Sequence, residues 1–146
     1  MIQRIQSIFL LLAAGGALGV FGLPFASTSQ AVSESAIFAD AQYNVFDNPA
    51  LMALFGIGGA LALVSIFLFN NRKLQMRLTI FAFIAVLIGT ILGVVSFMTS
   101  SSEMGDATIQ DEFGMYLPAV ALLFALLAYR FINKDEKLVK SMDRLR

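Results

Sequence analysis

Long stretches of apolar residues without a single charge alternate with short polar stretches along this chain. No charged residue occurs between Arg4 and Glu34, between Asp47 and Arg72, between Arg77 and Glu103, or between Glu112 and Arg130. A helix needs about 20 apolar residues, at about 1.5 Å each, to cross the hydrocarbon core of a bilayer. The pattern therefore predicts four transmembrane helices, at about residues 5–26, 49–69, 78–99 and 113–132.

The polar stretches between these helices divide the rest of the chain. They are two outer segments at 27–48 and 100–112, a cytoplasmic turn at 70–77, and a cytoplasmic tail at 133–146. Within the first outer segment, "QYNVF" carries a weak hairpin signal. We expect an all-α protein, a single membrane domain over 1–146 that folds as a four-helix bundle.

The first apolar stretch has a second interpretation as a cleaved signal peptide. Arg4 supplies a basic start, and "FASTSQA" offers small residues near a cleavage point. Against this, the stretch is closer to twenty residues than to the roughly seven to fifteen of a signal peptide, and three more spans follow. We therefore expect the first helix to be retained.

The charges are segregated, although ten Lys and Arg balance ten Asp and Glu. All cations lie at Arg4, in the 70–77 turn, or from Arg130 onward, whereas the two outer segments carry only acidic charges. Lys and Arg are retained on the cytoplasmic side of membrane proteins. The distribution predicts that both termini are cytoplasmic.

The chemistry of the chain argues against catalysis. It has no Cys and no His, and no catalytic motif or glycine-rich phosphate loop is present. "EMGDATIQDE" gathers four carboxylates but lacks the spacing of a calcium loop. We expect no enzymatic activity, no cofactor, no metal site and no nucleic-acid partner.

Apart from Arg130 near the end of the fourth, whose head can reach the interface, the predicted spans contain no Asp, Glu, Lys or Arg, which argues against a proton-coupled carrier. Ser65, Thr79, Thr90 and Ser96 are polar residues that can bond a backbone carbonyl four residues earlier. Small residues at helical spacing allow close helix packing in lipid. The candidates are Gly15, Gly19, Gly56, Gly59, Gly89 and Gly93. We expect them to pack within the chain's own bundle, the alternative being a homodimer or a partner protein.

Two basic segments are candidates for contact with lipid headgroups or a partner. Lys73 and Arg77 are four residues apart, so they share a helix face that suits a phospholipid phosphate. The tail is two-sided as a helix, with an apolar line beside a basic line, and either continues the fourth span or turns along the membrane. The candidate contact residues are Arg72, Lys73, Arg77, Lys134, Lys137, Leu138, Lys140, Met142, Arg144 and Leu145.

Three segments, "MIQRIQSIFLLLA", "NRKLQMRLTI" and "KDEKLVKSMDRLR", resemble a bacterial family of four-span membrane proteins catalogued as domain of unknown function 4293. The resemblance covers the chain end to end, with the first outer segment matching least well. It implies a multi-pass protein of the bacterial inner membrane with no established activity, and it supplies no functional residues.

These observations favour a protein that works by interaction, as an accessory subunit, assembly factor or tether. Its partners would be anionic lipid headgroups at the cytoplasmic face and a membrane or cytoplasmic protein. The alternative is a small homo-oligomeric transporter or pore built on the glycine stripes.

Overall fold

Four helices and a small sheet make up the computed structural model of this protein, which describes residues 2–29, 31, 37–101 and 108–143. The helices are α1 (Ile2–Gly19), α2 (Pro49–Phe67), α3 (Arg72–Ser101) and α4 (Leu117–Asp143). The strands are β1 (Ala26–Thr28), β2 (Gln42–Tyr43) and β3 (Ile109–Asp111), and two single 3-10 turns, η1 (Val45–Asp47) and η2 (Phe113–Met115), precede α2 and α4.

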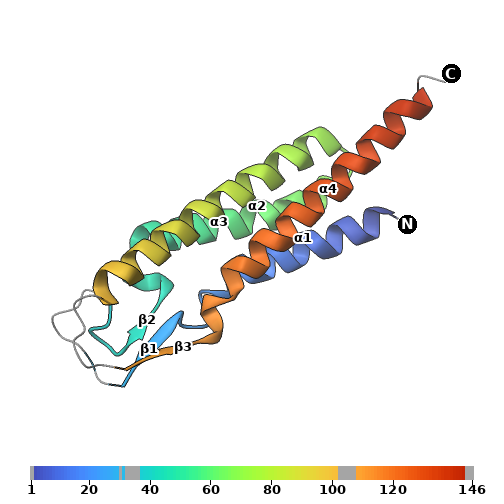
Figure 1. Cartoon of the computed structure of the whole chain (residues 1–146). Coiled ribbons are helices and arrows are strands. Elements are labelled where there is room, and N and C mark those ends of the chain that lie inside the picture. Colours follow the sequence, from blue (N-terminus) through green and yellow to red (C-terminus); the bar gives the residue numbers. More distant parts are fainter. Residues whose placement is uncertain (1, 30, 32–36, 102–107, 144–146) are drawn as a thin grey trace.

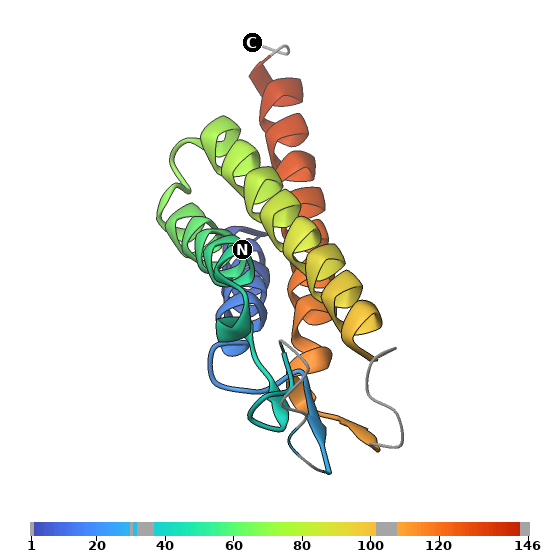
Figure 2. The same cartoon turned by 90° about the vertical axis from the view of Figure 1, so that its left-hand side faces the viewer.

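The helices lie side by side, with the sheet across one end (Figure 1). α1 packs against α4 and α2, α2 against α3, and α3 against α4. In the view from the side, α4 begins near the sheet, and its C-terminal end projects beyond the other helices (Figure 2). The predicted neighbours, the second and third helices, are therefore in contact.

Local capping explains where α2 and α3 begin. The Asn48 side chain accepts a hydrogen bond from the Ala50 N–H at 2.9 Å, and Pro49 occupies the first helical position, where its missing N–H costs nothing. The Asn71 side chain likewise accepts from the Leu74 N–H at 3.2 Å. Because α3 already begins at Arg72, most of the predicted 70–77 turn is helical.

Three helical stretches among the described residues are long and apolar enough to cross a membrane: Pro49–Phe67, Arg72–Ser101 and Phe113–Ser141. The apolar part of α1, Ile5–Gly19, is shorter. The helix α1 ends at Gly19, earlier than the end of the predicted span at about residue 26. After Gly19 the chain turns, and Pro24, which cannot donate to a helical hydrogen bond, leads into β1.

The structure is mostly helical, in line with the expected fold class, but the described residues also include a small antiparallel sheet with strand order β2-β1-β3, which was not predicted. β1 lies in the middle, with Ala26 opposite both Tyr43 and Asp111. The weak hairpin signal at "QYNVF" falls on β2, but β2 pairs with β1 and not within a hairpin of its own. The sheet closes the end of the helix assembly at which α1 ends and α4 begins (Figure 1).

Aromatic side chains fill the space between the sheet and the helices. The Phe25 ring packs on Tyr43 at a centroid distance of 5.2 Å, and the Tyr43 ring stacks on Phe97 of α3 at 6.3 Å. The Tyr43 hydroxyl donates a hydrogen bond to the Gly93 carbonyl at 3.0 Å. These contacts fix the sheet to α2 and α3 through a buried cluster that includes Phe38 and Phe55.

Candidate functional site

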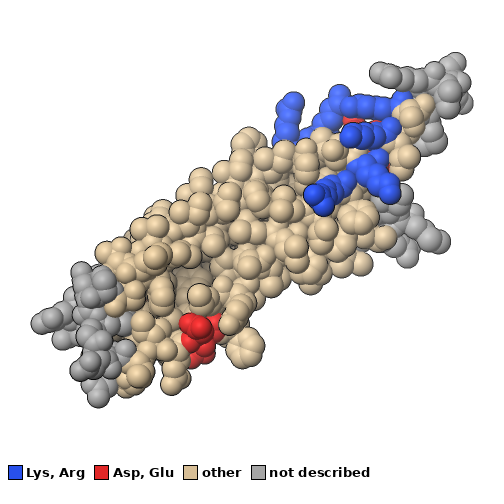
Figure 3. Space-filling model, in the orientation of Figure 1, with Lys and Arg blue, Asp and Glu red and all other residues tan. Residues whose placement is uncertain are grey.

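The start of α3 and the second half of α4 come together at one end of the molecule, which we call the basic end. Figure 3 shows Lys and Arg gathered there, far from the acidic residues beside the sheet. The described cations of the basic end are Arg72, Lys73, Arg77, Arg130, Lys134, Lys137 and Lys140. The fold thus brings the two predicted cytoplasmic segments into one surface.

An ion pair joins the two helices of the basic end. The Arg72 Nε lies 3.3 Å from the Asp135 Oδ2, and the two side chains are only 22% and 13% exposed. The sequence pattern indicated Arg72 as a candidate contact with lipid headgroups or a partner and gave Asp135 no role. The signal that could have identified the pair is the two adjacent acids, Asp135 and Glu136, in a basic tail: Glu136 has Lys140 as its i, i+4 partner, which leaves Asp135 to pair elsewhere.

The described part of the predicted tail, residues 133–143, is the continuous end of α4, so the helix continues from the fourth apolar stretch and does not turn away from it. Its Glu136 and Lys140 form an i, i+4 ion pair at 3.3 Å. Leu138 is 44% exposed on this projecting part. Of the other predicted contact residues, Met142 lies on helical backbone, whereas Arg144 and Leu145 fall outside the described residues.

Lys73 and Arg77 are both exposed on the first two turns of α3. Residues four apart lie on the same side of a helix, so their charges stand close together. Like charges at this spacing destabilise a helix by about 0.2–0.5 kcal/mol per pair unless an anion lies between them. A phosphate group fits this position chemically.

Buried polar side chains lie toward the basic end. Gln75 is 1% exposed, and its amide nitrogen donates to the Ser65 carbonyl at 3.0 Å. Gln6 is 3% exposed and donates to the Phe131 carbonyl at 3.3 Å. The Gln75 Oε1 is buried and has no hydrogen-bond partner among the described residues. Sequence reasoning had overlooked both glutamines, because neither carries a charge.

Three of the four predicted hydroxyl groups bond as expected, whereas the fourth, Ser96, is a hydrogen-bond partner of Tyr43. Ser65 donates to the Leu61 carbonyl at 2.8 Å, Thr79 to the Gln75 carbonyl at 2.8 Å, and Thr90 to the Val86 carbonyl at 2.7 Å. Each acceptor is four residues earlier on the same helix. These hydroxyl groups are satisfied locally and need no ligand.

Five of the six predicted packing glycines face other segments of the same chain. A Cβ at Gly59 would lie 2.5 Å from Leu18, one at Gly19 would lie 3.0 Å from Leu117, and one at Gly89 would lie 3.2 Å from Phe55. Gly56 and Gly93 have looser neighbours, the Phe21 ring and the Tyr43 hydroxyl, each at 3.6 Å. Gly15 has no atom within 4 Å of its would-be Cβ.

Three tighter glycines lie outside the set of six candidates. A Cβ at Gly16 would lie 2.9 Å from the Ala121 nitrogen on α4, and one at Gly58 would lie 2.6 Å from Val86 on α3. Gly114 leaves no room at all, because its Cβ would overlap the backbone of Pro24. A four-residue spacing selects Gly15 and Gly19 on α1, whereas the close contact with α4 is made by Gly16.

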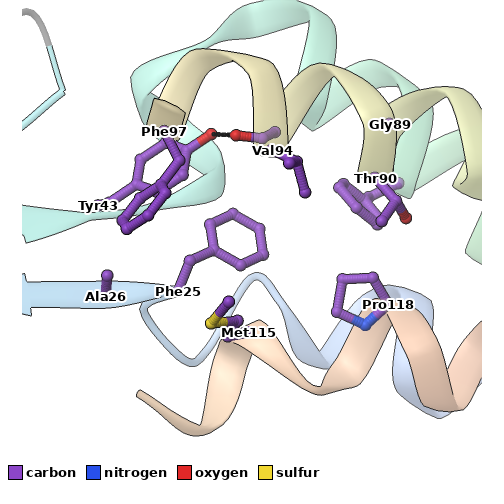
Figure 4. Close-up of a pocket in the computed structure, with 11 residues that line it drawn as sticks. Phe25, Ala26, Tyr43, Gly89, Thr90, Val94, Phe97, Met115 and Pro118 are labelled. Atoms are coloured by element: carbon purple, nitrogen blue, oxygen red, sulfur yellow. Dashed lines mark hydrogen bonds between the residues drawn. The ribbon is translucent and has the colours of Figure 1, made fainter. Parts of the chain in front are cut away.

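A pocket of about 100 Å³ lies between α3, α4 and the sheet. Figure 4 shows Phe25 and Tyr43 from the sheet side, Thr90 and Val94 from α3, and Pro118 from α4 around it. Its walls are almost entirely carbon. Nothing in the sequence pattern marks this pocket, because its walls come from five separated segments.

Among the described residues, no group of three or more Asp or Glu side chains lies close enough together to hold a metal ion. Glu103 and Asp106, two of the carboxylates in "EMGDATIQDE", fall outside the described residues.

The chain is similar to a known protein family. No curated protein matches the sequence. The model of the family "Domain of unknown function (DUF4293)" matches residues 2–145, which is nearly the whole chain. The match agrees with the resemblance carried by the N-terminus, the segment around Arg72 and the end of the chain. The protein belongs to the DUF4293 family.

Proposed function

We propose that this protein is a small multi-pass protein of a bacterial inner membrane that works by interaction, as an accessory subunit, assembly factor or tether. In this proposal its four helices form a membrane-spanning bundle, and both termini lie in the cytoplasm. α1 crosses together with the turn that follows it, since the apolar part of its helix alone is shorter than the other three.

The distribution of charge along the long axis supports the proposed orientation. The basic end carries all the described Lys and Arg of α3 and α4, and the sheet end carries Asp40, Asp47, Asp111 and Glu112. The surface between them presents large apolar side chains such as Ile91, which is 56% exposed, and Leu123, also 56% exposed. An apolar belt between a basic and an acidic end is the arrangement that a bilayer and the positive-inside rule favour.

The observation that carries the proposal is the end of α4, which projects past the other helices (Figure 1). This projecting part presents Leu138 together with Lys137 and Lys140, all exposed. Basic residues near an anionic leaflet contribute about 1 kcal/mol each. An exposed leucine on the same short stretch adds nothing to orientation, so it is the group that a protein partner would bind.

The test is copurification from native membranes in mild detergent. The intact chain is compared with a chain ending at Lys137, which keeps the Arg72–Asp135 ion pair and so leaves α3 joined to α4. We expect the intact protein to bring down a partner in fixed stoichiometry and the shortened chain to lose it.

Two variants separate protein from lipid contact. Leu138→Ser should weaken binding of the protein partner. Lys134→Ser together with Lys137→Ser should weaken binding to anionic vesicles and reduce the salt dependence of that binding. Ser141→Ala, which leaves both groups of residues intact, is the matched control. Recovery of the intact protein as a lone monomer in several mild detergents would count against the proposal.

The alternative, a homo-oligomeric transporter or pore, draws less support. It would place the glycine stripes between copies of the chain. Gly19, Gly56, Gly59, Gly89 and Gly93 instead have side chains of the same chain as neighbours, which leaves only Gly15 of that set open to a second copy.

A further inference from the structure

The pocket between α3 and α4 is open to the side of the molecule. Figure 3 shows a hollow between the two helices, near the acidic residues of the sheet end. Val94 of α3 is 49% exposed and Met115, just before α4, is 46% exposed, and both line the pocket. Phe55 forms the inner wall and is only 1% exposed. The pocket therefore leads from the apolar surface into the interior.

The polar groups at the pocket are already used. The Tyr43 hydroxyl donates to the Gly93 carbonyl at 3.0 Å (Figure 4). The Thr90 hydroxyl donates to the Val86 carbonyl at 2.7 Å. A pocket with apolar walls and no free hydrogen-bonding group does not hold water, because a buried water needs two to four polar partners. Such a pocket takes an apolar occupant.

The depth of the pocket indicates what that occupant is. Its α3 residues, Gly89 to Phe97, lie within the last thirteen residues of a helix that ends at Ser101, or within roughly 20 Å of its end at about 1.5 Å per residue. Half the hydrocarbon core is about 15 Å thick. In the proposed membrane position, the mouth of the pocket thus faces the acyl chains of the leaflet on the sheet side.

Size narrows the occupant further. An apolar cavity of about 150 Å³ accommodates one benzene molecule. The present pocket, at about 100 Å³, is too small for a whole lipid and large enough for a short run of methylene groups. Its open side lets the rest of a chain remain in the bilayer.

We propose that this pocket binds a segment of one acyl chain from a bilayer phospholipid, inserted between α3 and α4 as far as Phe55. The proposal rests on the membrane location given above. Gly89 and Gly93 make room for the chain on the α3 side, and Pro118 faces them from α4.

The chain has no Trp, so a single introduced indole is a unique fluorescent reporter. The full-length Phe55→Trp variant is reconstituted in phosphatidylcholine vesicles whose acyl chains carry bromine, a contact quencher, and in unbrominated vesicles. We expect its fluorescence to be quenched by the brominated chains, although position 55 is sealed from the lipid-facing surface except through the pocket. Adding Val94→Phe, which fills the mouth, should abolish the quenching.

The adjacent substitution Val95→Phe is the matched control. Val95 is 55% exposed on the same helix and does not line the pocket, so the Phe55→Trp reporter should stay quenched beside it. Phe81→Trp, at a side chain 58% exposed on α3, reports membrane insertion by itself. Quenching at position 81 without quenching at position 55 would overturn the acyl-chain site alone. No quenching at position 81 would overturn the membrane location.

A second measurement needs no buried substitution. Native mass spectrometry of the otherwise unchanged protein should detect one retained phospholipid. Val94→Phe should remove it, whereas Val95→Phe should not. Equal retention by the two variants would contradict the proposal.

Discussion

At the scale of single residues, the unusual feature is polar groups buried between apolar helices. Gln75 is the clearest case, because its nitrogen is bonded to the Ser65 carbonyl while its oxygen has no partner among the described residues. An unpaired buried acceptor costs about 1–3 kcal/mol. The Ser65 carbonyl also accepts from the Leu68 N–H at 3.3 Å, so it does not depend on Gln75 alone.

Gln75→Leu should therefore leave the free energy of unfolding unchanged or raise it by up to about 1 kcal/mol, since it removes the unpaired oxygen and leaves the Ser65 carbonyl bonded. Gln75→Glu places a carboxylate in the same buried position and should cost several kcal/mol. Thermal unfolding in detergent, followed by circular dichroism, compares the two. A larger loss for Gln75→Leu than for Gln75→Glu would contradict this account.

Tyr43 makes the free energy of unfolding depend on pH. Burial, opposed by a hydrogen bond from Ser96 and reinforced by the charge of Asp47, raises the pKa of Tyr43 from 10.0 to about 12. The native state therefore keeps the proton where the unfolded state loses it. The resulting stabilisation is fully present below pH 10 and is lost as the pH rises through about 12, by on the order of 2 kcal/mol.

Comparison with Tyr43→Phe isolates this effect, because the variant keeps the other titrating groups. Below pH 10 the wild type should be the more stable by about 1 kcal/mol, the value of its bond to the Gly93 carbonyl. The difference should shrink and then reverse in sign between pH 10 and 12. Urea unfolding at several pH values measures it, and a difference that does not change with pH would refute the assignment.

At the scale of helices, a few glycines set the distance between neighbouring helices. α1 meets α4 where Gly16 faces the Ala121 backbone, and α2 meets α3 where Gly58 faces Val86. Within lipid the hydrophobic effect does not drive helices together, so close approach and dispersion contacts carry their association. Gly16 and Gly58 are therefore more important for packing than the exposed Gly15.

Gly15 and Gly16 form a natural test pair on α1. Gly16→Ala should lower the free energy of unfolding by roughly 1–3 kcal/mol, because its Cβ would press on the backbone of α4. Gly15→Ala should be neutral or raise it by about 0.5–1 kcal/mol, because alanine favours a helix and meets no atom. Unfolding curves of both variants measure the difference. Equal effects would show that α1 and α4 are not held at this point.

At the scale of the whole molecule, the main feature is the separation of charge between the two ends. The sheet, its acidic rim and the acyl-chain pocket lie at one end, and the projecting part of α4 lies at the other (Figures 1 and 3). In the proposed membrane position, such a protein would be anchored by its middle and would present different chemistry on each side of the membrane.

The absence of cysteine from the sequence makes the proposed orientation easy to test. Gln110→Cys, on exposed β3, should react with a membrane-impermeant maleimide in right-side-out inner-membrane vesicles. Ser141→Cys, exposed near the end of α4, should react only after detergent is added. Both positions are exposed, so accessibility in detergent is the control. Labelling of both cysteines from the same side would rule out the orientation.

The sequence by itself determined the helical regions and the charged ends. Charge-free apolar runs and the position of Lys and Arg are properties of the chain taken in order, so they could be predicted without any contact. The local hydroxyl bonds of Ser65, Thr79 and Thr90 could be predicted for the same reason, since donor and acceptor are one helical turn apart.

Only the tertiary structure decided what joins distant segments. Strands of two or three residues are too short to show an alternating pattern, so the pairing of Ala26 with Tyr43 and Asp111 could not be predicted. The Arg72–Asp135 ion pair, the contact of Gly16 with Ala121 and the pocket also join residues far apart in the chain. They depend on the rotation and spacing of whole helices, which in a membrane are set by shape and not by the hydrophobic pattern.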